Sequence, residues 1–147
     1  MSEFGVDLGE LLEAAGVRKV IFDGRENLIP YPAFGRLLSE CERRSNCEHI
    51  TLLISQHTRL TDFGLAGQIA LCAEYAGEGL QRFADHFNMH SSATTASVIT
   101  SGQFTRFVYA IAEQGMTSTR QLQLGAMVTA YNVLRDLFGS AWLPTVI

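Results

Sequence analysis

The alternation of apolar and polar residues is most regular in the last third of the chain. Apolar residues recur every three or four positions from about residue 118 to 138, which predicts one long amphipathic helix. Ser118 followed by Gln121 has the spacing of a capping box at the start of this helix. The residues expected to form its buried stripe are Leu124, Met127, Tyr131, Leu134 and Phe138. The apolar residues 145–147 that close the sequence allow a further strand at the C-terminus.

Helical spacing also predicts shorter helices in the first half of the chain. The first covers Leu8 to Ala15 and stops at Gly16, a residue type that suits the end of a helix. The second lies within residues 29–46, and a third is expected over residues 49–57. The expected buried stripe of the second helix is Phe34, Leu37, Leu38 and Cys41. Residues 17–28, between the first two helices, are expected to be irregular.

Two more helices are expected before residue 90. Asp62 is a candidate N-cap for a helix over residues 63–75, whose small residues would let a neighbouring element approach closely. Its inward residues are expected to be Leu65, Ile69 and Cys72. Gly77 is expected to break the chain before the next helix. That helix would bury Leu80, Phe83, Ala84 and Phe87.

The local composition of the sequence then changes to residue types that favour strands. Thr, Val, Ile, Phe and Tyr predominate from Ser92 to Ile111, with a turn expected at Ser101-Gly102. This pattern predicts an antiparallel hairpin over about residues 94–112. The predicted fold is therefore α+β, a mostly helical domain with helices against one face of a small antiparallel sheet.

Composition narrows the classes of protein that are possible. A chain of 147 residues, 47% hydrophobic and 18% charged, is expected to form a single packed domain. No apolar run approaches the ~20 residues that span a bilayer, and the N-terminus lacks the basic region of a signal peptide, so we expect a cytoplasmic protein without membrane contact. The net charge of −4 and the single lysine do not favour direct DNA binding. The three cysteines are expected to be reduced.

Four segments in order carry a resemblance to a known family. The last of them combines a strand, a glycine-containing loop, a long helix and the pattern G-x-x-W-x-P. The segments are residues 5–17, 28–56, 62–90 and 107–147. Together they resemble the N-terminal effector-binding and dimerisation domain of AraC-type bacterial transcription regulators, in the helical subgroup named arabinose-binding.

The resemblance implies a sensor domain that controls a DNA-binding region. Members of the family continue past the W-x-P pattern and then carry two helix-turn-helix units, which this sequence lacks. Residues 1–147 are therefore expected to form one truncated sensor domain, with the DNA-binding domain absent. Its implied partners are a small-molecule effector and a second copy of the chain, with DNA contacted only through the missing domain.

The residues offer little to catalysis, to metal binding or to a cofactor. His86 and His90 are four apart, but no third metal ligand is predictably near them. Cys72 falls in an apolar stripe and is expected to be buried and inert, and no G-x-S-x-G elbow, paired carboxylates or phosphate loop occurs. We therefore expect neither an enzyme nor a cofactor or metal site.

The candidate ligand-binding residues are Arg106, Phe107, Tyr109 and Arg120. Arg106 lies in an apolar run, so it either faces inward toward an acidic partner or effector, or faces solvent on the hairpin. Phe107 and Tyr109 alternate with it and equally suit a core. Arg120 begins the long helix, where the dipole favours an anion.

The sequence also suggests where two copies of the chain would meet. Leu122, Val133 and Leu137 fall off the main stripe of the long helix, which indicates deep burial or a shared dimer interface. The predicted function is effector sensing and dimerisation for an AraC-type regulator. The alternatives are a small enzyme whose site is not recognisable in the sequence, and a stand-alone dimerisation module without ligand.

Overall fold

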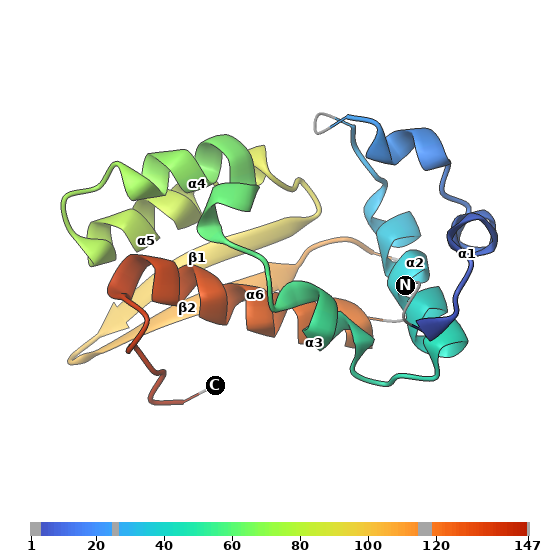
Figure 1. Ribbon diagram of the computed structural model, residues 1–147. Helices are drawn as coiled ribbons and strands as arrows, with labels where there is room; N and C mark the ends of the chain where they lie inside the picture. Colours follow the sequence, from blue (N-terminus) through green and yellow to red (C-terminus); the bar gives the residue numbers. More distant parts are fainter. Residues whose placement is uncertain (1–3, 25–26, 115–118, 147) are drawn as a thin grey trace. The chain divides into compact units, whose positions relative to one another are not determined.

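The computed structural model describes residues 4–24, 27–114 and 119–146 and confirms the α+β class (Figure 1). The elements are α1 (Leu8–Ala15), η2 (Lys19–Phe22), α2 (Tyr31–Ser45), α3 (Ile50–Ser55), η3 (Leu60–Phe63), α4 (Gly64–Leu71), α5 (Ala76–Asp85), η4 (Phe87–Met89), β1 (Thr94–Ser101), β2 (Phe104–Ile111) and α6 (Arg120–Phe138). The chain forms two compact units. The first unit contains the described residues up to Ser55 and from Glu113 to Gly125, and the second unit contains those from Gln56 to Ala112 and from Ala126 onward.

The core of the first unit lies between α1 and α2. Asp7 caps α1, because its carboxylate accepts a hydrogen bond of 2.9 Å from the Glu10 amide. The predicted bounds of α1 are confirmed, and the predicted helix over residues 29–46 is α2. Most of its predicted stripe is buried, and Phe34 is half-buried. The core residues are Leu11, Leu12, Ala15, Val17, Ala33, Leu37, Cys41 and Ile50.

Buried polar contacts join α3 to the start of α6 in the first unit. Gln121, which is 2% exposed, accepts a hydrogen bond from the Thr51 hydroxyl and donates one of 2.8 Å to the Glu48 carbonyl. Its amide is thus paired at both ends, as burial of a polar group requires. Ser118, its predicted partner in a capping box, lies outside the described residues. The helices are so close that a Cβ atom on Gly125 would lie 2.6 Å from the Thr51 methyl carbon.

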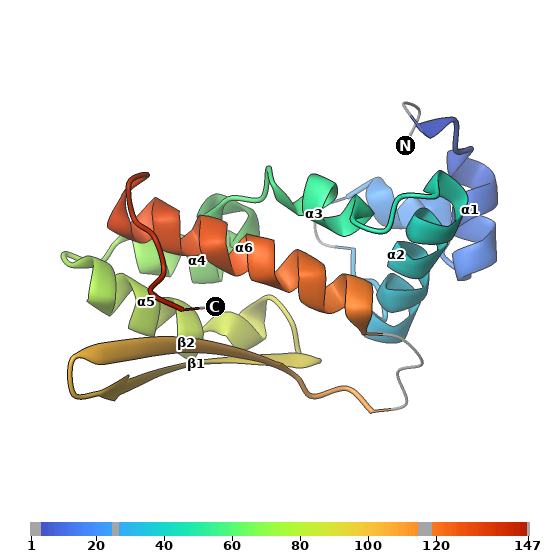
Figure 2. The ribbon, with the colours of Figure 1, turned by 90° about the horizontal axis from the view of Figure 1, so that it is seen from below.

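The second unit contains the predicted hairpin. Strands β1 and β2 pair antiparallel from Thr94 opposite Ile111 to Ser101 opposite Phe104. The two-residue turn is Gly102-Gln103, one position later than predicted, and Gly102 has a φ of 60°, as the first central residue of a type II′ turn requires. Figure 2 shows the hairpin with α5 and the later part of α6 on the same face, which confirms the predicted layering.

Aromatic and small residues form the core of the second unit. Phe83 is fully buried and packs edge-on against Phe63 and Phe87, with ring centroids 5.0 and 5.3 Å apart. The inward residues predicted for α5 are therefore confirmed, and Phe87 follows in η4. The remaining members of this cluster are Leu60, Ala66, Ala70 and Val133, with Phe107, Tyr109 and Leu137 packed against it.

The predicted inward face of the helix over residues 63–75 is wrong. Helix α4 buries Ala66, Gly67 and Ala70, while Leu65 and Cys72 are exposed and Ile69, the third predicted residue, is half-buried. The reason is a close approach to η3, because a Cβ atom on Gly67 would overlap a backbone carbonyl of η3. The expectation that Cys72 is buried is therefore also wrong. The predicted cap also differs, since the Asp62 carboxylate accepts a hydrogen bond at the start of η3.

The break before α5 also differs from the prediction. Helix α4 ends at Leu71, and the chain between the helices passes through residues 72–75. Gly77, expected to form this break, lies in the first turn of α5 and has open space around it.

The predicted buried stripe of α6 is wrong as well. Met127 is 43% exposed and Phe138 is exposed, whereas Val133 is 1% exposed and Leu122 is buried. Burial therefore follows residues that the pattern placed off the stripe, and Leu137 also packs against the core of the second unit. Of the three residues that fall off the predicted stripe, Leu122 and Val133 are deeply buried and Leu137 is partly buried.

The C-terminal residues do not form the further strand that the sequence allowed. The sheet has two strands, and residues 139–146 lie outside both of them. Trp142 instead packs against α6, with its ring centroid 5.9 Å from Phe138 and 6.4 Å from Tyr131.

Candidate ligand-binding site

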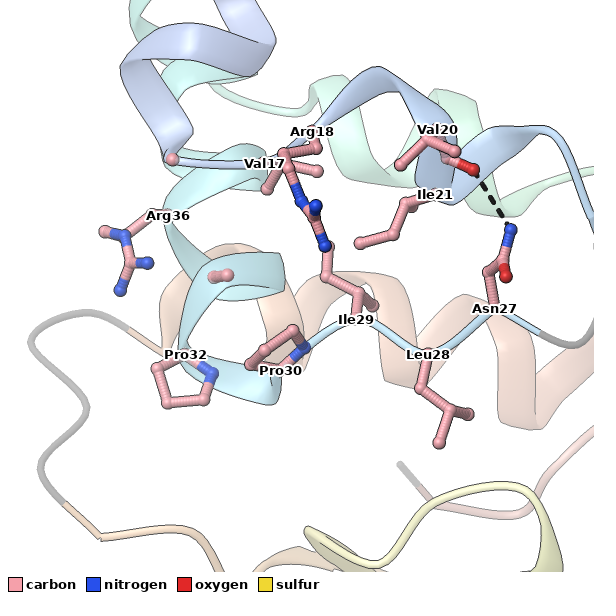
Figure 3. Close-up of a pocket in the computed structure, with 12 residues that line it drawn as sticks. Val17, Arg18, Val20, Ile21, Asn27, Leu28, Ile29, Pro30, Pro32 and Arg36 are labelled. Atoms are coloured by element: carbon pink, nitrogen blue, oxygen red, sulfur yellow. Dashed lines mark hydrogen bonds between the residues drawn. The ribbon is translucent and has the colours of Figure 1, made fainter.

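The first unit contains a cavity of about 470 Å³ between the end of α1 and the start of α2 (Figure 3). This volume falls within the range of about 300–1,000 Å³ that is usual for small-molecule sites. Apolar residues predominate in its walls, together with two arginines and one asparagine. The lining residues are Gly16, Val17, Arg18, Val20, Ile21, Asn27, Leu28, Ile29, Pro30, Pro32, Ala33 and Arg36.

The end of α1 forms one side of the cavity. Gly16 adopts a left-handed φ of 67°, and its amide donates a hydrogen bond to the Glu13 carbonyl. The next amide, of Val17, donates a hydrogen bond of 2.9 Å to the Leu12 carbonyl, which completes a Schellman motif. This motif turns the chain out of the helix, so that Val17 enters the core and Arg18 begins the cavity wall.

The irregular segment and the entry to α2 form the opposite side. The Asn27 side chain donates a hydrogen bond of 3.0 Å to the Val20 carbonyl and so ties the segment back onto η2. In Figure 3 the Arg18 side chain extends toward Ile29, whereas Leu28 points away from them. Pro30 and Pro32 fix the backbone where the chain enters α2, since proline suits the first helical turn.

The charge of the cavity wall is positive. Arg18 and Arg36 contribute two guanidinium groups, and no Asp or Glu is among the residues that line the cavity in the described part of the chain. Arg36 uses its Nε to donate a hydrogen bond of 3.2 Å to the Ala15 carbonyl at the end of α1. This contact sets the position of its guanidinium group against Gly16. The whole chain carries a net charge of −4, so the local excess of cations is opposite in sign to the overall charge.

A smaller cavity of about 290 Å³ in the second unit has its polar groups already paired. Asp136 forms an ion pair with Arg59 and accepts a hydrogen bond of 2.8 Å from the Leu60 amide. These contacts hold the start of η3 against α6. The carboxylate and the guanidinium satisfy each other, so this cavity offers a ligand few unpaired polar groups.

The structure separates the candidate ligand residues of the hairpin. Phe107 and Tyr109 face the core of the second unit, with ring centroids 6.3 Å from Phe83 and 6.1 Å from Phe87 respectively. Arg106 lies on the opposite, exposed face of β2. The solvent-facing alternative for Arg106 is thus the one observed, and it shares no surface of the hairpin with the two aromatic residues.

Arg120, the fourth candidate, belongs to the first unit and is paired with carboxylates. Its guanidinium group forms an ion pair with Glu42 of α2, and a second one of 3.7 Å with Glu48. These contacts neutralise the charge that the sequence offered to an anionic ligand. Arg120 therefore links α2 to the first turn of α6.

Among the described residues no group of three His, Cys, Asp or Glu side chains could hold a metal ion, so neither His86 nor His90 belongs to such a group. His86 ends α5 and its Nδ1 lies 2.8 Å from the Arg82 carbonyl. His90 follows η4 and its ring packs on Phe63 and Phe87 although the residue is exposed overall, and the partial loss of water around the ring lowers the pKa of its imidazole.

The sequence interpretation missed Arg18 and Arg36. For Arg18 the signal was its place in the connection between two well-defined helices, because binding residues concentrate in such connections, although that connection contains η2 and is not wholly irregular. No local signal marked Arg36, which lies within α2. The distance between the two arginines in the sequence conceals that both line one cavity.

Comparison with known proteins identifies the family. Residues 5–147 match the family described as the arabinose-binding domain of AraC transcription regulators, N-terminal. The chain belongs to this family. No curated protein matches it. Membership agrees with the resemblance inferred from the four ordered segments.

An arabinose-binding domain of this family is a ligand-sensing regulatory domain, and the family is not one of enzymes. In the part of the chain that the structure describes, no helix is both long enough and apolar enough to cross a membrane.

Proposed function

We propose that this domain binds a small-molecule effector in the cavity of the first unit, and that occupancy controls a DNA-binding region of an AraC-type regulator. The protein would act in the cytoplasm, where such a regulator meets DNA. The observation that carries the proposal is the cavity itself. Apolar side chains line it together with Arg18, Arg36 and Asn27, its volume is usual for a small-molecule site, and the chain belongs to a ligand-sensing family.

The arrangement of α2 supports a route from the cavity to α6. Arg36 lines the cavity from α2, and Glu42 on the same helix pairs with Arg120 in the first turn of α6. Gln121 adds its buried hydrogen bonds to Thr51 and to the Glu48 carbonyl. An effector would shift the regulator between states only by the difference in its affinity for them.

The test is a binding screen on the isotopically labelled chain. Metabolites that are small enough for the cavity, including neutral, cationic and anionic compounds, are added while amide resonances are recorded by NMR. We expect at least one compound to shift the resonances of residues 17–21 and 29–36 in a saturable manner. A screen in which these resonances never respond, while those of the hairpin do, would move the site to Arg106, Phe107 or Tyr109.

A matched pair of variants separates cavity binding from surface binding. Val20 lines the cavity and is 52% exposed, so Val20→Trp is expected to obstruct the cavity without disturbing the core. Val108 is also exposed, on the outer face of β2, and Val108→Trp makes the same chemical change there. Binding should be lost in Val20→Trp and retained in Val108→Trp.

Self-association forms a second part of the proposal. Leu122 and Val133 are buried within their units, so any interface must use other residues. The exposed apolar residues Met127, Phe138 and Leu143 at α6 and the segment after it are the candidates. Light scattering of the purified chain should show a dimer at high concentration, and Met127→Glu should weaken it. A monomer at all concentrations would remove this part and leave effector binding intact.

A further inference from the structure

We infer that the effector is an aliphatic carboxylate rather than a neutral sugar. This inference rests on the proposed function, because it concerns the ligand of the same cavity. Three features of the cavity carry it: the uncompensated positive charge, the lack of hydrogen-bond acceptors on its side chains, and the aliphatic character of its walls.

Two arginines without a carboxylate favour an anion. Arg18 and Arg36 line the cavity, and no described carboxylate lines it with them. Within the described residues, neither guanidinium group has an Asp or Glu within 4.0 Å, whereas Arg43, Arg44, Arg59, Arg82 and Arg120 all have one. Arg106 and Arg135 have none either, but of these four arginines only Arg18 and Arg36 line the cavity. An arginine presents its donors in a planar fork that matches the two oxygens of a carboxylate.

The side chains of the cavity are poor partners for a sugar. Every hydroxyl group of a sugar needs an acceptor for its proton, but an arginine supplies donors only. Asn27 is the one lining side chain with an acceptor oxygen, and its amide nitrogen is already bonded to the Val20 carbonyl. A neutral ligand with several hydroxyls would therefore have to find its acceptors among backbone carbonyls, the Asn27 oxygen and water, whereas a carboxylate needs only the donors that the arginines supply.

The remaining walls are aliphatic. Val17, Ile21, Ile29 and the two prolines, Pro30 and Pro32, contribute branched or cyclic carbon surfaces, and no aromatic side chain lines the cavity in the described residues. A ligand with a short hydrocarbon portion would bury that portion against these walls, while its charged end meets a guanidinium group.

The experiment compares a carboxylate with its neutral amide, with carboxylates of other lengths and with a sugar. The probes are 4-methylpentanoate and its isosteric amide, 4-methylpentanamide, with the straight-chain carboxylates from butanoate to octanoate, and with L-arabinose. Each is titrated into the full chain by calorimetry, and cavity occupancy is checked through the amide resonances of residues 17–21. We expect at least one carboxylate to bind there, and 4-methylpentanamide and L-arabinose to bind at least about tenfold more weakly, a factor that corresponds to 1.4 kcal/mol. Raising the salt concentration should weaken the carboxylate alone.

Variants that remove one positive charge each test the two arginines. Arg18→Gln should weaken the best carboxylate about tenfold or more, since a hydrogen bond to a charged group is lost. Arg36→Gln should do the same, but it also removes the bond to the Ala15 carbonyl, so Arg18→Gln is the cleaner variant. Arg43→Gln is the control on α2, because Arg43 pairs with Glu40 and does not line the cavity. It should bind as the parent chain does.

The outcomes distinguish an error in the class of ligand from an error in the binding site. If 4-methylpentanamide or L-arabinose occupies the cavity as tightly as every carboxylate, or if Arg18→Gln changes nothing, the inference is wrong and the sensing cavity stands. If no carboxylate reaches the cavity at millimolar concentration, the inference is also wrong. Only the absence of any cavity ligand in the wider screen would remove the proposed function itself.

Discussion

The close contact between α3 and α6 makes a strong prediction about two positions at once. Gly125 faces Thr51, and an alanine there would bring its Cβ atom to 2.6 Å from the Thr51 methyl carbon and 3.1 Å from the Ser55 hydroxyl oxygen. Carbon atoms in contact are usually about 3.5–4.0 Å apart, so the helices would have to separate by about 1 Å. Thr51 cannot rotate away without losing its buried hydrogen bond to Gln121.

The expected cost of Gly125→Ala follows from two opposing terms. Overpacking a core costs about 1–3 kcal/mol, and alanine in place of glycine within a helix returns about 1 kcal/mol. Gly77→Ala calibrates the second term, because Gly77 lies in α5 with nothing within 4 Å of an added Cβ atom. We therefore expect Gly125→Ala to be less stable than Gly77→Ala by about 1–3 kcal/mol.

The decisive measurement is the double variant. Thr51→Ser removes the methyl group that overlaps the new Cβ atom and keeps the hydroxyl that bonds Gln121. Free energies of unfolding from urea titrations of the parent, Gly125→Ala, Thr51→Ser and the double variant then form a cycle. The double variant should be more stable than the sum of the single effects by about 1 kcal/mol or more, as neighbouring positions show. Additive effects would mean that α3 and α6 do not meet at these atoms.

Three further predictions concern single side chains. Asp136→Ala should destabilise the chain by about 1–3 kcal/mol, because the Leu60 amide loses its acceptor. Urea unfolding followed by tryptophan fluorescence measures this loss of stability, and an unchanged unfolding midpoint would contradict the prediction. The hydrogen bond from Arg43 lowers the pKa of the Glu40 carboxyl, so its contribution to stability is complete above the ordinary value of 4.5 and disappears as the pH falls through the lowered pKa. Glu40→Gln should therefore flatten the stability–pH curve below pH 4.5, and an unaltered slope would argue against the pair. Cys72 is exposed, so a thiol reagent should label it first in the native chain, as mass spectrometry of peptides would show.

Elements with strong local signals could be predicted from the sequence. Helix α1 carries a capping Asp7 and a terminating Gly16, and both act within one turn of the backbone. The hairpin was predictable for the same reason, since strand-forming residues flank a single glycine turn at Gly102. The one-residue error in the turn reflects that Ser101 still pairs with Phe104.

The buried faces of α4 and α6 could not be predicted by hydrophobic spacing. Helix α6 carries apolar residues on most of its surface, so spacing alone defines no single face. In the first unit, α6 buries the side on which Gly125 allows close contact with α3 and Gln121 forms a hydrogen bond with it. In α4 the small Gly67 is likewise preferred over the larger Leu65, because a short distance between backbones requires it.

Local sequence patterns could not predict the cavity, for a related reason. Its arginines come from the end of one helix and the second turn of another, and only tertiary structure brings them to one wall. Arg106 was a candidate ligand-binding residue because apolar residues surround it in the sequence, yet the alternation of side chains along β2 places it on the exposed face.

The first unit joins the cavity to α6 by contacts that all involve one helix, α2, and the segment that follows it. A ligand held by Arg36 would act on α2, and Glu42 lies less than two turns further along that helix, paired with Arg120. The Glu48 carbonyl, just beyond the end of α2, accepts the Gln121 side chain in the same first turn of α6. The first turn of α6 is therefore held to α2, and to the segment that follows α2, by paired charges and by a buried amide within the first unit.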